Sequence, residues 1–390
     1  MSESALDDAI TALAGRPPRE EPCMNLPPFR IEKYYERHEF TTRYMVSSSD
    51  CESWMLRELL SFEPDALDRL LAIRCGYTVS RGAPELRRAI AATYQTIDAD
   101  EVVVTTCAEE AIFLVYHALL SPDHHAVSET PCYESALQLA RSTGAAVDEW
   151  QRVHADGWAH DLDALGHLLQ PGTRVLYINQ PHNPTGTLMS RSTFDRVVEL
   201  AKELRLTLFS DEVYRGLEHD PADRLPAACD RDQHAVSLGS VSKSYGLPGL
   251  RIGWIASHDE ALRRKVVDLK HYTTICASAP SEKLSALALR HGPELLARNC
   301  GIVRRNLGLL DEFLGRHAET FDWVRPTAGP IGFPRVTGVG DVDGFCERLA
   351  AAGVLLLPGS VYDQPEHVRV GFGRANLPEA LAVLEEALTG

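Results

Sequence analysis

Residues 173–214 read TRVLYINQPHNPTGTLMSRSTFDRVVELAKELRLTLFSDEVY. Two short apolar runs, RVLYIN and LTLFSDE, each end in polar residues, and the segment SRSTFDRVVELAKEL between them has the spacing of an amphipathic helix. A strand, a helix and a second strand in this order predict a βαβ unit, in which the two strands run parallel in one sheet.

The same alternation continues on both sides of this stretch. Short apolar runs such as EVVVTT, AVSET and AVSLGS alternate with predicted helices such as AEEAIFLVYHALL. A further helix is predicted from PELRRAIAATYQ, where Pro84 stands at a favourable first-turn position. The chain is therefore predicted to be an α/β protein with a mostly parallel sheet. Ligands of such sheets bind beyond the carboxyl ends of the strands, where the polar residues of this sequence fall.

The two ends of the chain differ from this central pattern. Residues 1–28 lack periodicity and contain several prolines, which predicts a mobile N-terminal arm. Residues 29–70 are helical in patches around a polar turn, and we expect them to contribute to a small domain and to the substrate site. Residues 71–280 form the predicted large domain. Residues 281–390 form a predicted small α+β domain. They contain long stretches with helical spacing and the short predicted strands IGFPRV, GVLLLPG and HVRVGFG.

Composition limits the classes of partner. The 390 residues include 39 Lys and Arg against 55 Asp and Glu, a net charge of −16, and an acidic surface repels nucleic acid and anionic lipid. The sequence has no apolar run of about 18 residues that could span a membrane, and its N-terminus lacks a signal pattern. The nine cysteines form no CxxC pair, so no metal site is expected. These features predict a soluble, cytoplasmic protein.

Three motifs carry reactive side chains. They are Asn183-Pro-Thr-Gly, Asp211 at the end of its predicted strand, and Ser240-Val-Ser242-Lys243 with Arg251 downstream. Singly they are compatible with a turn, a helix cap and a solvated loop. Together, two hydroxyls and a guanidinium can hold a phosphate, a lysine can form a Schiff base, and a carboxylate can pair with a pyridine nitrogen. This inventory favours pyridoxal phosphate (PLP) over a nucleotide, because no GxGxxG or P-loop motif occurs.

From about Tyr77 to the C-terminus, the chain resembles the fold type I, aspartate-aminotransferase-like PLP enzymes. The matching segments are YTVSRGAPELRRAIA, NPTG, DEVY, SxSKxxGxxGLRxG and VRVGFG. The resemblance implies a large domain with a mostly parallel seven-stranded sheet, a smaller α+β domain, an amino acid substrate, and a homodimer whose active sites are shared between subunits. Tyr77 would reach the phosphate in the neighbouring subunit.

The resemblance also assigns roles at the site. Lys243 would bind the cofactor aldehyde and act as the catalytic base, and Asp211 would partner the pyridine nitrogen. Asn183 and Tyr214 would bond the phenolic oxygen. The remaining cofactor contacts would come from Ser240, Ser242, Arg251, the stacking residue Tyr133, and the backbone near Ala108 and Glu109 at a helix N-terminus. Arg369 would bind the substrate carboxylate.

Two segments depart from the usual family pattern. Cys107 and Glu109 stand where the family usually has a glycine and small or amide residues, and Ser48-Ser49-Asp50 replaces glycine and apolar residues in the segment that faces the substrate. With PHNPTG and KSYGLPGLRIGW, that second segment resembles the capreomycidine synthases of peptide-antibiotic pathways, which cyclise β-hydroxylated arginines. On chemical grounds, Asp50 or Glu109 could orient a guanidinium.

The leading hypothesis is therefore loss of water from a β-hydroxylated arginine, followed by attack of its own guanidine. The product would be a cyclic guanidino amino acid of the capreomycidine or hydroxycapreomycidine type. The alternative is an ordinary aminotransferase with a 2-oxo acid acceptor. A non-catalytic, effector-sensing regulator is a third reading, against which the intact Lys243 and the short acidic N-terminus both argue.

Overall fold

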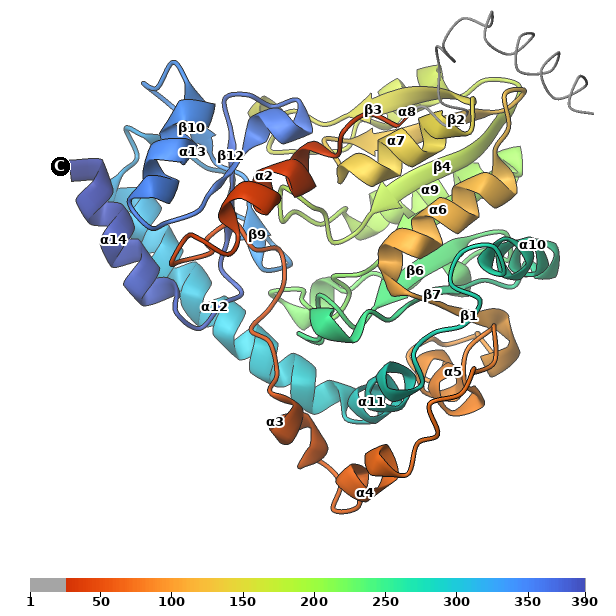
Figure 1. Ribbon diagram of the computed structural model, residues 1–390. Coiled ribbons are helices and arrows are strands. Elements are labelled where there is room, and N and C mark those ends of the chain that lie inside the picture. Colours follow the sequence, from red (N-terminus) through yellow and green to blue (C-terminus); the bar gives the residue numbers. More distant parts are fainter. Residues whose placement is uncertain (1–25, 390) are drawn as a thin grey trace, which may run out of the picture.

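A central seven-stranded sheet organises the computed structural model, which describes residues 26–389 (Figure 1). Its strands are β1 (Val102–Thr105), β2 (His125–Thr130), β3 (Ala146–Gln151), β4 (Thr173–Asn179), β5 (Thr207–Asp211), β6 (Val236–Ser240) and β7 (Gly253–Ala256). They lie in the order β1-β7-β6-β5-β4-β2-β3, and of these seven only β7 runs antiparallel to its neighbours. The predicted mostly parallel sheet is confirmed, and the carboxyl ends of the other six strands meet along one edge.

Both faces of the central strands are covered, which explains why strands such as β4 read as nearly continuous apolar runs, whereas the edge strand β3 is largely exposed. In β4, Val175 and Tyr177 pack into one core, whereas the alternate residues Leu176 and Ile178 pack into another. Figure 1 shows helices α6, α7 and α10 in front of the sheet and α8 and α9 behind it. These helices span Cys107–Leu119 (α6), Glu134–Ser142 (α7), Leu162–Leu168 (α8), Arg191–Leu204 (α9) and Glu260–Lys270 (α10).

A third group of helices packs beside the edge strand β1. Here α5 (Pro84–Ala91) and α11 (Ala279–Arg290) lie against one another, and α3 (Leu56–Leu60) and α4 (Ala66–Leu71) contact α11. Short 3₁₀ helices occupy several connections: η1 (Ala99–Glu101), η2 (His154–Asp156), η3 (Pro221–Asp223), η4 (Ala228–Asp230), η5 (Pro248–Leu250) and η6 (Gly359–Tyr362).

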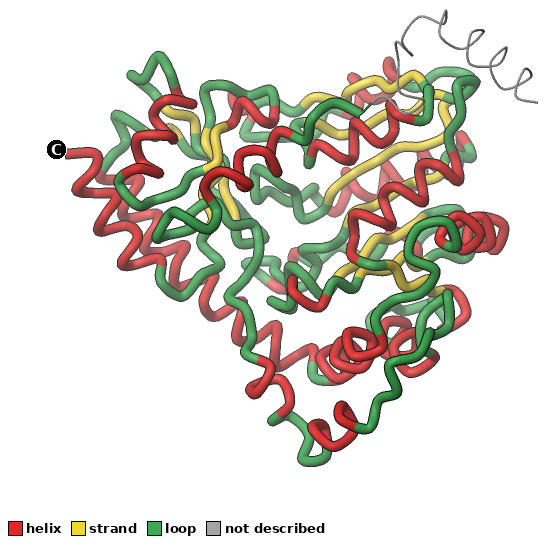
Figure 2. Tube along the Cα trace, viewed as in Figure 1, coloured by secondary structure: helices red, strands yellow, loops and turns green. Residues whose placement is uncertain are grey.

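The C-terminal region mixes helices with very short strands (Figure 2). Its elements are α12 (Gly292–Arg316), β8 (Phe321–Asp322), β9 (Ile331–Gly332), β10 (Arg335–Val336), α13 (Val342–Ala351), β11 (Leu357–Pro358), β12 (Val368–Gly371) and α14 (Leu377–Thr389). The segment IGFPRV, which we predicted as one strand, is split between β9, which pairs with β12, and β10, which pairs with β8. Pro334 lies at the break, because it has no N–H to continue a ladder.

Helix α2 (Arg30–His38) connects the C-terminal region to the large sheet. Arg30 donates from its backbone N and Nε to Glu134 of α7 at 2.7 and 3.2 Å, and it pairs with Asp363 at 2.7 Å. Tyr44 forms a bridge with Val354. The segment after residue 29 thus packs partly on the C-terminal region, while the domain boundaries near residues 70 and 280 remain a prediction.

Most of the predicted mobile arm, residues 1–25, lies outside the described residues. Within residues 26–389, none of the helices combines the length and the apolar character needed to cross a bilayer.

Candidate active site

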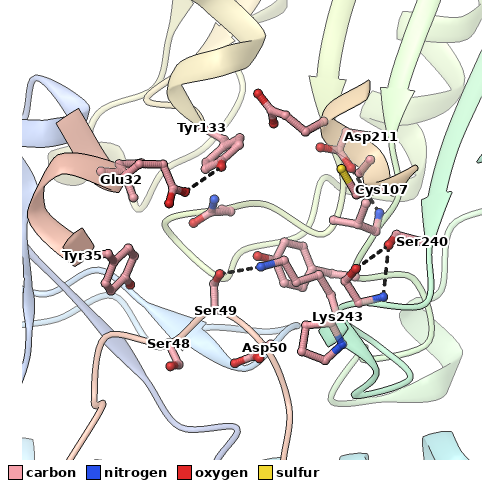
Figure 3. A pocket seen from close by; sticks show the side chains of 18 of the residues that line it. Glu32, Tyr35, Ser48, Ser49, Asp50, Cys107, Tyr133, Asp211, Ser240 and Lys243 are labelled. Carbon is pink, nitrogen blue, oxygen red and sulfur yellow. Dashed lines mark hydrogen bonds between the residues drawn. The ribbon is translucent and has the colours of Figure 1, made fainter. Parts of the chain in front are cut away.

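One cavity of about 370 Å³ lies where the carboxyl ends of the strands face α2 and the loop before α3 (Figure 3). It brings together all but one of the side chains singled out from the sequence. The predicted site residues that line it are Ser49, Asp50, Ala108, Glu109, Tyr133, Asn183, Asp211, Tyr214, Ser240, Ser242, Lys243, Arg251 and Arg369. Tyr77 does not line this cavity, and its side chain is 90% exposed.

Lys243 follows the end of β6 in a loop that its own serines stabilise. The backbone N–H of Ser242 donates to Ser240 Oγ at 3.0 Å, which turns the chain so that the lysine enters the cavity. Lys243 Nζ donates to Ser49 Oγ at 2.9 Å (Figure 3). Burial lowers the pKa of this amine, although the nearby Asp50 carboxylate opposes the shift. A lowered pKa favours the neutral amine, which is the nucleophilic and basic form.

Asp211 is the last residue of β5 and is 6% exposed. Tyr177 donates its hydroxyl to Asp211 Oδ2 at 3.1 Å, and the Val213 backbone donates to Oδ1 at 3.2 Å. Burial raises the pKa of this carboxyl to about 6. Within the described residues it has no salt-bridge partner, so a cationic ring nitrogen beside it would stabilise its ionised form.

An anion-binding corner lies at the start of α6. The first N–H groups of a helix lack intrahelical acceptors, and here those near Ala108 and Glu109 lie in the same cavity wall as Ser240, Ser242 and Arg251. The start of β7 packs directly on this turn, because a Cβ at Gly253 would overlap the backbone of Cys107. The departure at Cys107 is accommodated in the left-handed region, with φ of 66°.

Arg369 of β12 also lines the cavity and is 2% exposed. Its Nη2 donates to the Ser47 carbonyl at 2.8 Å and to the Tyr35 hydroxyl at 2.7 Å, and its Nη1 donates to Asn183 Oδ1 at 3.2 Å and to the Tyr362 hydroxyl. All of these acceptors are uncharged, and no carboxylate of the described residues pairs with it. A buried guanidinium without a counter-charge is suited to binding a carboxylate ligand.

Besides Asp211, four carboxylates line the cavity, namely Glu32, Glu39, Asp50 and Glu109. Arg374 Nη2 donates to both oxygens of Asp50, at 2.9 and 3.0 Å. Glu109 instead accepts a hydrogen bond from Ser135 Oγ at 3.1 Å, and Glu32 accepts one from the Tyr133 hydroxyl at 3.3 Å. Burial raises the pKa of Glu109 to about 7. Among the described residues, neither Glu109 nor Glu32 forms a salt bridge.

A buried hydrogen-bond network holds the carboxyl ends of β2, β4 and β5 together. Glu129 of β2 pairs with Arg152 at 2.9 Å and accepts the backbone N–H of Asn179 at 2.8 Å. The Asn179 side chain in turn donates to the Asp211 carbonyl at 2.9 Å and accepts the Asn183 N–H at 2.7 Å. Asp211 and Asn183 are therefore held in a fixed relation by a hydrogen-bonded core, a feature that keeps site geometry rigid.

No sequence pattern had marked Glu32, Tyr35, Tyr362 or Arg374 as site residues. Glu32 and Tyr35 lie three residues apart on α2, so their shared helix face was readable, but nothing in the sequence showed that this face would meet the cavity. Tyr362 and Arg374 belong to connections around β12, and no local signal marks them.

The donor set fits PLP. The cavity combines an anion-binding corner, an amine on Lys243, a buried carboxyl on Asp211 without a counter-charge, and the aromatic ring of Tyr133. The amide nitrogen of Asn183, whose oxygen is bonded to Tyr362 and Arg369, has no acceptor among the described residues. These residues would hold the phosphate, the aldehyde, the pyridine nitrogen, the ring face and the phenolic oxygen, respectively.

Comparisons with known proteins agree with this chemistry. The family model "Aminotransferase class I and II" matches residues 64–385. Capreomycidine synthase from Streptomyces vinaceus is 32% identical over 371 residues, which cover 93% of this chain and 94% of the synthase. A PLP-dependent aminotransferase from Streptococcus suis superposes with a TM-score of 0.89 at 31% identity, covering 94% of this chain and 98% of the other. The PLP-dependent cyclase OrfR superposes with a TM-score of 0.85 at 31% identity, covering 96% and 99%.

Proposed function

The chain belongs to the class I and II aminotransferase family and is a PLP-dependent enzyme, and we propose that it converts a β-hydroxylated arginine into a cyclic guanidino amino acid. The reaction would be loss of water across Cα and Cβ, followed by addition of the guanidine to Cβ, giving a product of the capreomycidine or hydroxycapreomycidine type. Such a step belongs to peptide-antibiotic biosynthesis. Similarity to a capreomycidine synthase and to a PLP-dependent cyclase supports this proposal.

The distribution of charge in the cavity carries the proposal. Arg369 provides a cationic end for the α-carboxylate, and the unpaired Glu109 and Glu32 provide an anionic end around Tyr133. An arginine derivative carries the complementary charges, because its carboxylate and its guanidinium lie at opposite ends. Of the two guanidinium-binding candidates taken from the sequence, Asp50 already holds Arg374, so we assign this role to Glu109, with Glu32 beside it.

Each residue of the site would have a separate role in this reaction. When bound, PLP acts as an electron sink that acidifies the Cα–H of the substrate amine. Lys243 Nζ would take this proton, and burial, which lowers the pKa of this amine, favours the neutral base. In its ionised form, Asp211 would stabilise a proton on the ring nitrogen of the bound cofactor. Arg369 and Glu109 hold the two ends of the substrate, so that the guanidine attacks Cβ intramolecularly at a high effective concentration.

The product formed from β-hydroxyarginine tests the proposal. We expect one product that has lost one water and has kept its amino group, observed by mass spectrometry. The ordinary aminotransferase alternative predicts a 2-oxo acid together with pyridoxamine phosphate that 2-oxoglutarate returns to PLP. A 2-oxo acid as the main product would contradict cyclisation and leave the family assignment untouched.

The substitution Glu109→Gln tests the anionic end. It keeps the shape of the side chain but removes the charge, so we expect L-arginine to bind about 10- to 100-fold more weakly, the cost of one charge-assisted hydrogen bond. L-citrulline, which replaces the guanidinium with a neutral urea, should bind with unchanged affinity. Titration of the visible absorption of the cofactor measures both, and Glu36→Gln, on the solvent side of α2, is the matched control.

The same carboxyl predicts a pH dependence. Because the pKa of Glu109 is about 7, the group becomes neutral as the pH falls below 7. Arginine affinity of the native enzyme should then fall, by about tenfold from pH 8 to pH 6. In the Glu109→Gln variant this slope should disappear. Glu32, Asp211 and Arg251 also face Glu109 and act on its charge, so a slope that persists in the variant would assign the titration to one of them.

We also propose that the enzyme is a homodimer in which Tyr77 reaches the neighbouring subunit. Tyr77 is 90% exposed and lies outside the cavity of its own chain. The next residue, Thr78, donates its hydroxyl to the Ala277 carbonyl at 3.0 Å. The loop that carries Tyr77 therefore lies beside the segment that contains the exposed Tyr272 and Ile275. Apolar side chains gathered on one exposed surface are typical of a subunit interface.

A further inference from the structure

Ser49 lies at the base that the reaction uses. Its Oγ is 2.9 Å from Lys243 Nζ, and its side chain lines the cavity between Ser48 and Asp50 (Figure 3). In this contact the lysine is the donor and the hydroxyl is the acceptor. A serine hydroxyl carries one proton of its own, so Ser49 can still donate to a further acceptor in the cavity. The Tyr214 hydroxyl lies close enough to be such an acceptor.

The loop that carries Ser49 is held by close backbone packing against β12. A Cβ at Gly371 would overlap the carbonyl of Ser48, and one at Gly373 would overlap the carbonyl of Asp50, so only glycine allows this approach. The backbone N–H of Gly371 donates to the Val46 carbonyl at 2.6 Å, and that of Glu52 donates to the Gly373 carbonyl at 2.8 Å. The two glycines of the VRVGFG motif therefore set the position of the serine.

Two arginines hold the same loop from either side of Ser49. Arg369 donates to the Ser47 carbonyl at 2.8 and 3.2 Å, and Arg374 holds the Asp50 carboxylate at 2.9 Å. Ser49 is thus fixed before substrate arrives, as a group that transfers a proton must be. The Asp50 carboxylate beside Lys243 also favours the ammonium form that the lysine reaches after it has taken a proton.

We propose that Ser49 relays a proton from Lys243 to the departing β-hydroxyl group; this rests on the proposed function. In the balanced step, the Cα–H bond breaks and its proton moves to Lys243 Nζ. Nζ then passes a proton to Ser49 Oγ, Oγ gives its own proton to the β-oxygen, and the Cβ–O bond breaks to release water. Lysine and serine return to their starting forms, and no oxidant or reductant is consumed.

The relay explains a departure seen in the sequence. From the family resemblance we expected glycine and apolar residues in this segment, which here reads Ser48-Ser49-Asp50. Transamination expels no group from Cβ and therefore needs no acid there. Hydroxide is a poor leaving group, so a positioned acid contributes typically about 10²- to 10⁴-fold to its loss. Ser49 would thus direct the common first step, removal of the Cα proton, toward elimination.

Two rates measured on one substrate test this role. In D₂O, native enzyme and the Ser49→Ala and Ser49→Thr variants receive β-hydroxyarginine, and mass spectrometry follows both water loss and deuterium incorporation at Cα of the recovered substrate. For Ser49→Ala we expect water loss to fall by about 10²-fold or more while deuterium exchange continues, because Lys243 still removes the proton. Ser49→Thr, which keeps a hydroxyl, should retain most of the elimination. The visible spectrum and cofactor content of each purified variant show whether its site is intact.

Each other outcome has a defined meaning. Equal losses of exchange and elimination in Ser49→Ala would show that Ser49 only positions Lys243, and unchanged elimination would show that the hydroxyl is not used; both overturn the relay. If the native enzyme exchanges deuterium at Cα but releases no water, the proposed cyclisation fails, and with it the relay. Failure of the relay alone, with water loss intact in the native enzyme, leaves the proposed function standing.

Discussion

Replacement of Lys243 by alanine is expected to lower turnover by at least about 10³-fold. In the proposed function the lysine is the base for the Cα proton, a role that contributes about 10²- to 10⁴-fold, and it is also the amine assigned to the covalent bond with the cofactor. Its Nζ contacts Ser49 inside the cavity, and among residues 26–389 no other lysine lines that cavity. Steady-state kinetics on β-hydroxyarginine measures the loss.

The covalent bond can be examined separately from the rate. Borohydride reduction of the native enzyme, followed by peptide mapping, should place the reduced cofactor on Lys243, and the alanine variant should carry no label. Lys265→Ala, an exposed lysine on α10, is the matched control and should keep both label and rate. A label on another lysine in native enzyme would contradict the assignment of Lys243.

Replacement of Arg369 by glutamine is expected to lower kcat/KM for the amino acid substrate by about 100-fold. The lost interaction is a charge-assisted hydrogen bond to the α-carboxylate, worth about 1.5–3 kcal/mol. The variant should still fold, because Ser47, Tyr35, Asn183 and Tyr362 are neutral partners and no buried carboxylate loses its counter-charge.

The loss should appear mainly in KM. An interaction with the carboxylate is made equally before and during the reaction, and such uniform binding lowers KM without raising kcat. Arg369→Lys should show an intermediate loss, since it keeps the charge but not the planar pair of donors. Arg348→Gln, an exposed position on α13, controls for surface charge. A fall in kcat with KM unchanged would show that Arg369 does not bind the substrate carboxylate.

Much of the fold could be predicted because the relevant signals are local. The strand-helix-strand pattern of residues 173–214 predicted β4, α9 and β5. The polar residues Asn179 and Asp211 stand at the strand ends as expected. The prediction that IGFPRV forms one strand was wrong, because a single residue controls its strand pairing. Pro334 lacks the backbone N–H that a continuous β-ladder needs, and the spacing of apolar residues carries no information about that.

The grouping of the proposed cofactor-binding residues could also be predicted from the sequence, since these residues lie at fixed offsets from strand ends. Lys243, Ser242 and Ser240 follow one strand, and a parallel sheet brings that strand end next to Asp211 on its neighbour. The substrate side was not readable in this way. Asp50 and Glu109 were equal candidates for the guanidinium until the structure placed Arg374, more than 300 residues along the chain, on Asp50 alone.

By itself, then, the sequence determined the layered α/β fold and the chemistry of the cofactor, because alternation, motif spacing and strand ends are properties of neighbouring residues. Only the tertiary structure decided which carboxylates remain without a counter-charge, which hydroxyl contacts Lys243, and that α2 closes the cavity with Glu32 and Tyr35. Those contacts join residues far apart in the chain, and whether a charge is paired depends on how distant segments pack, not on the residues beside it.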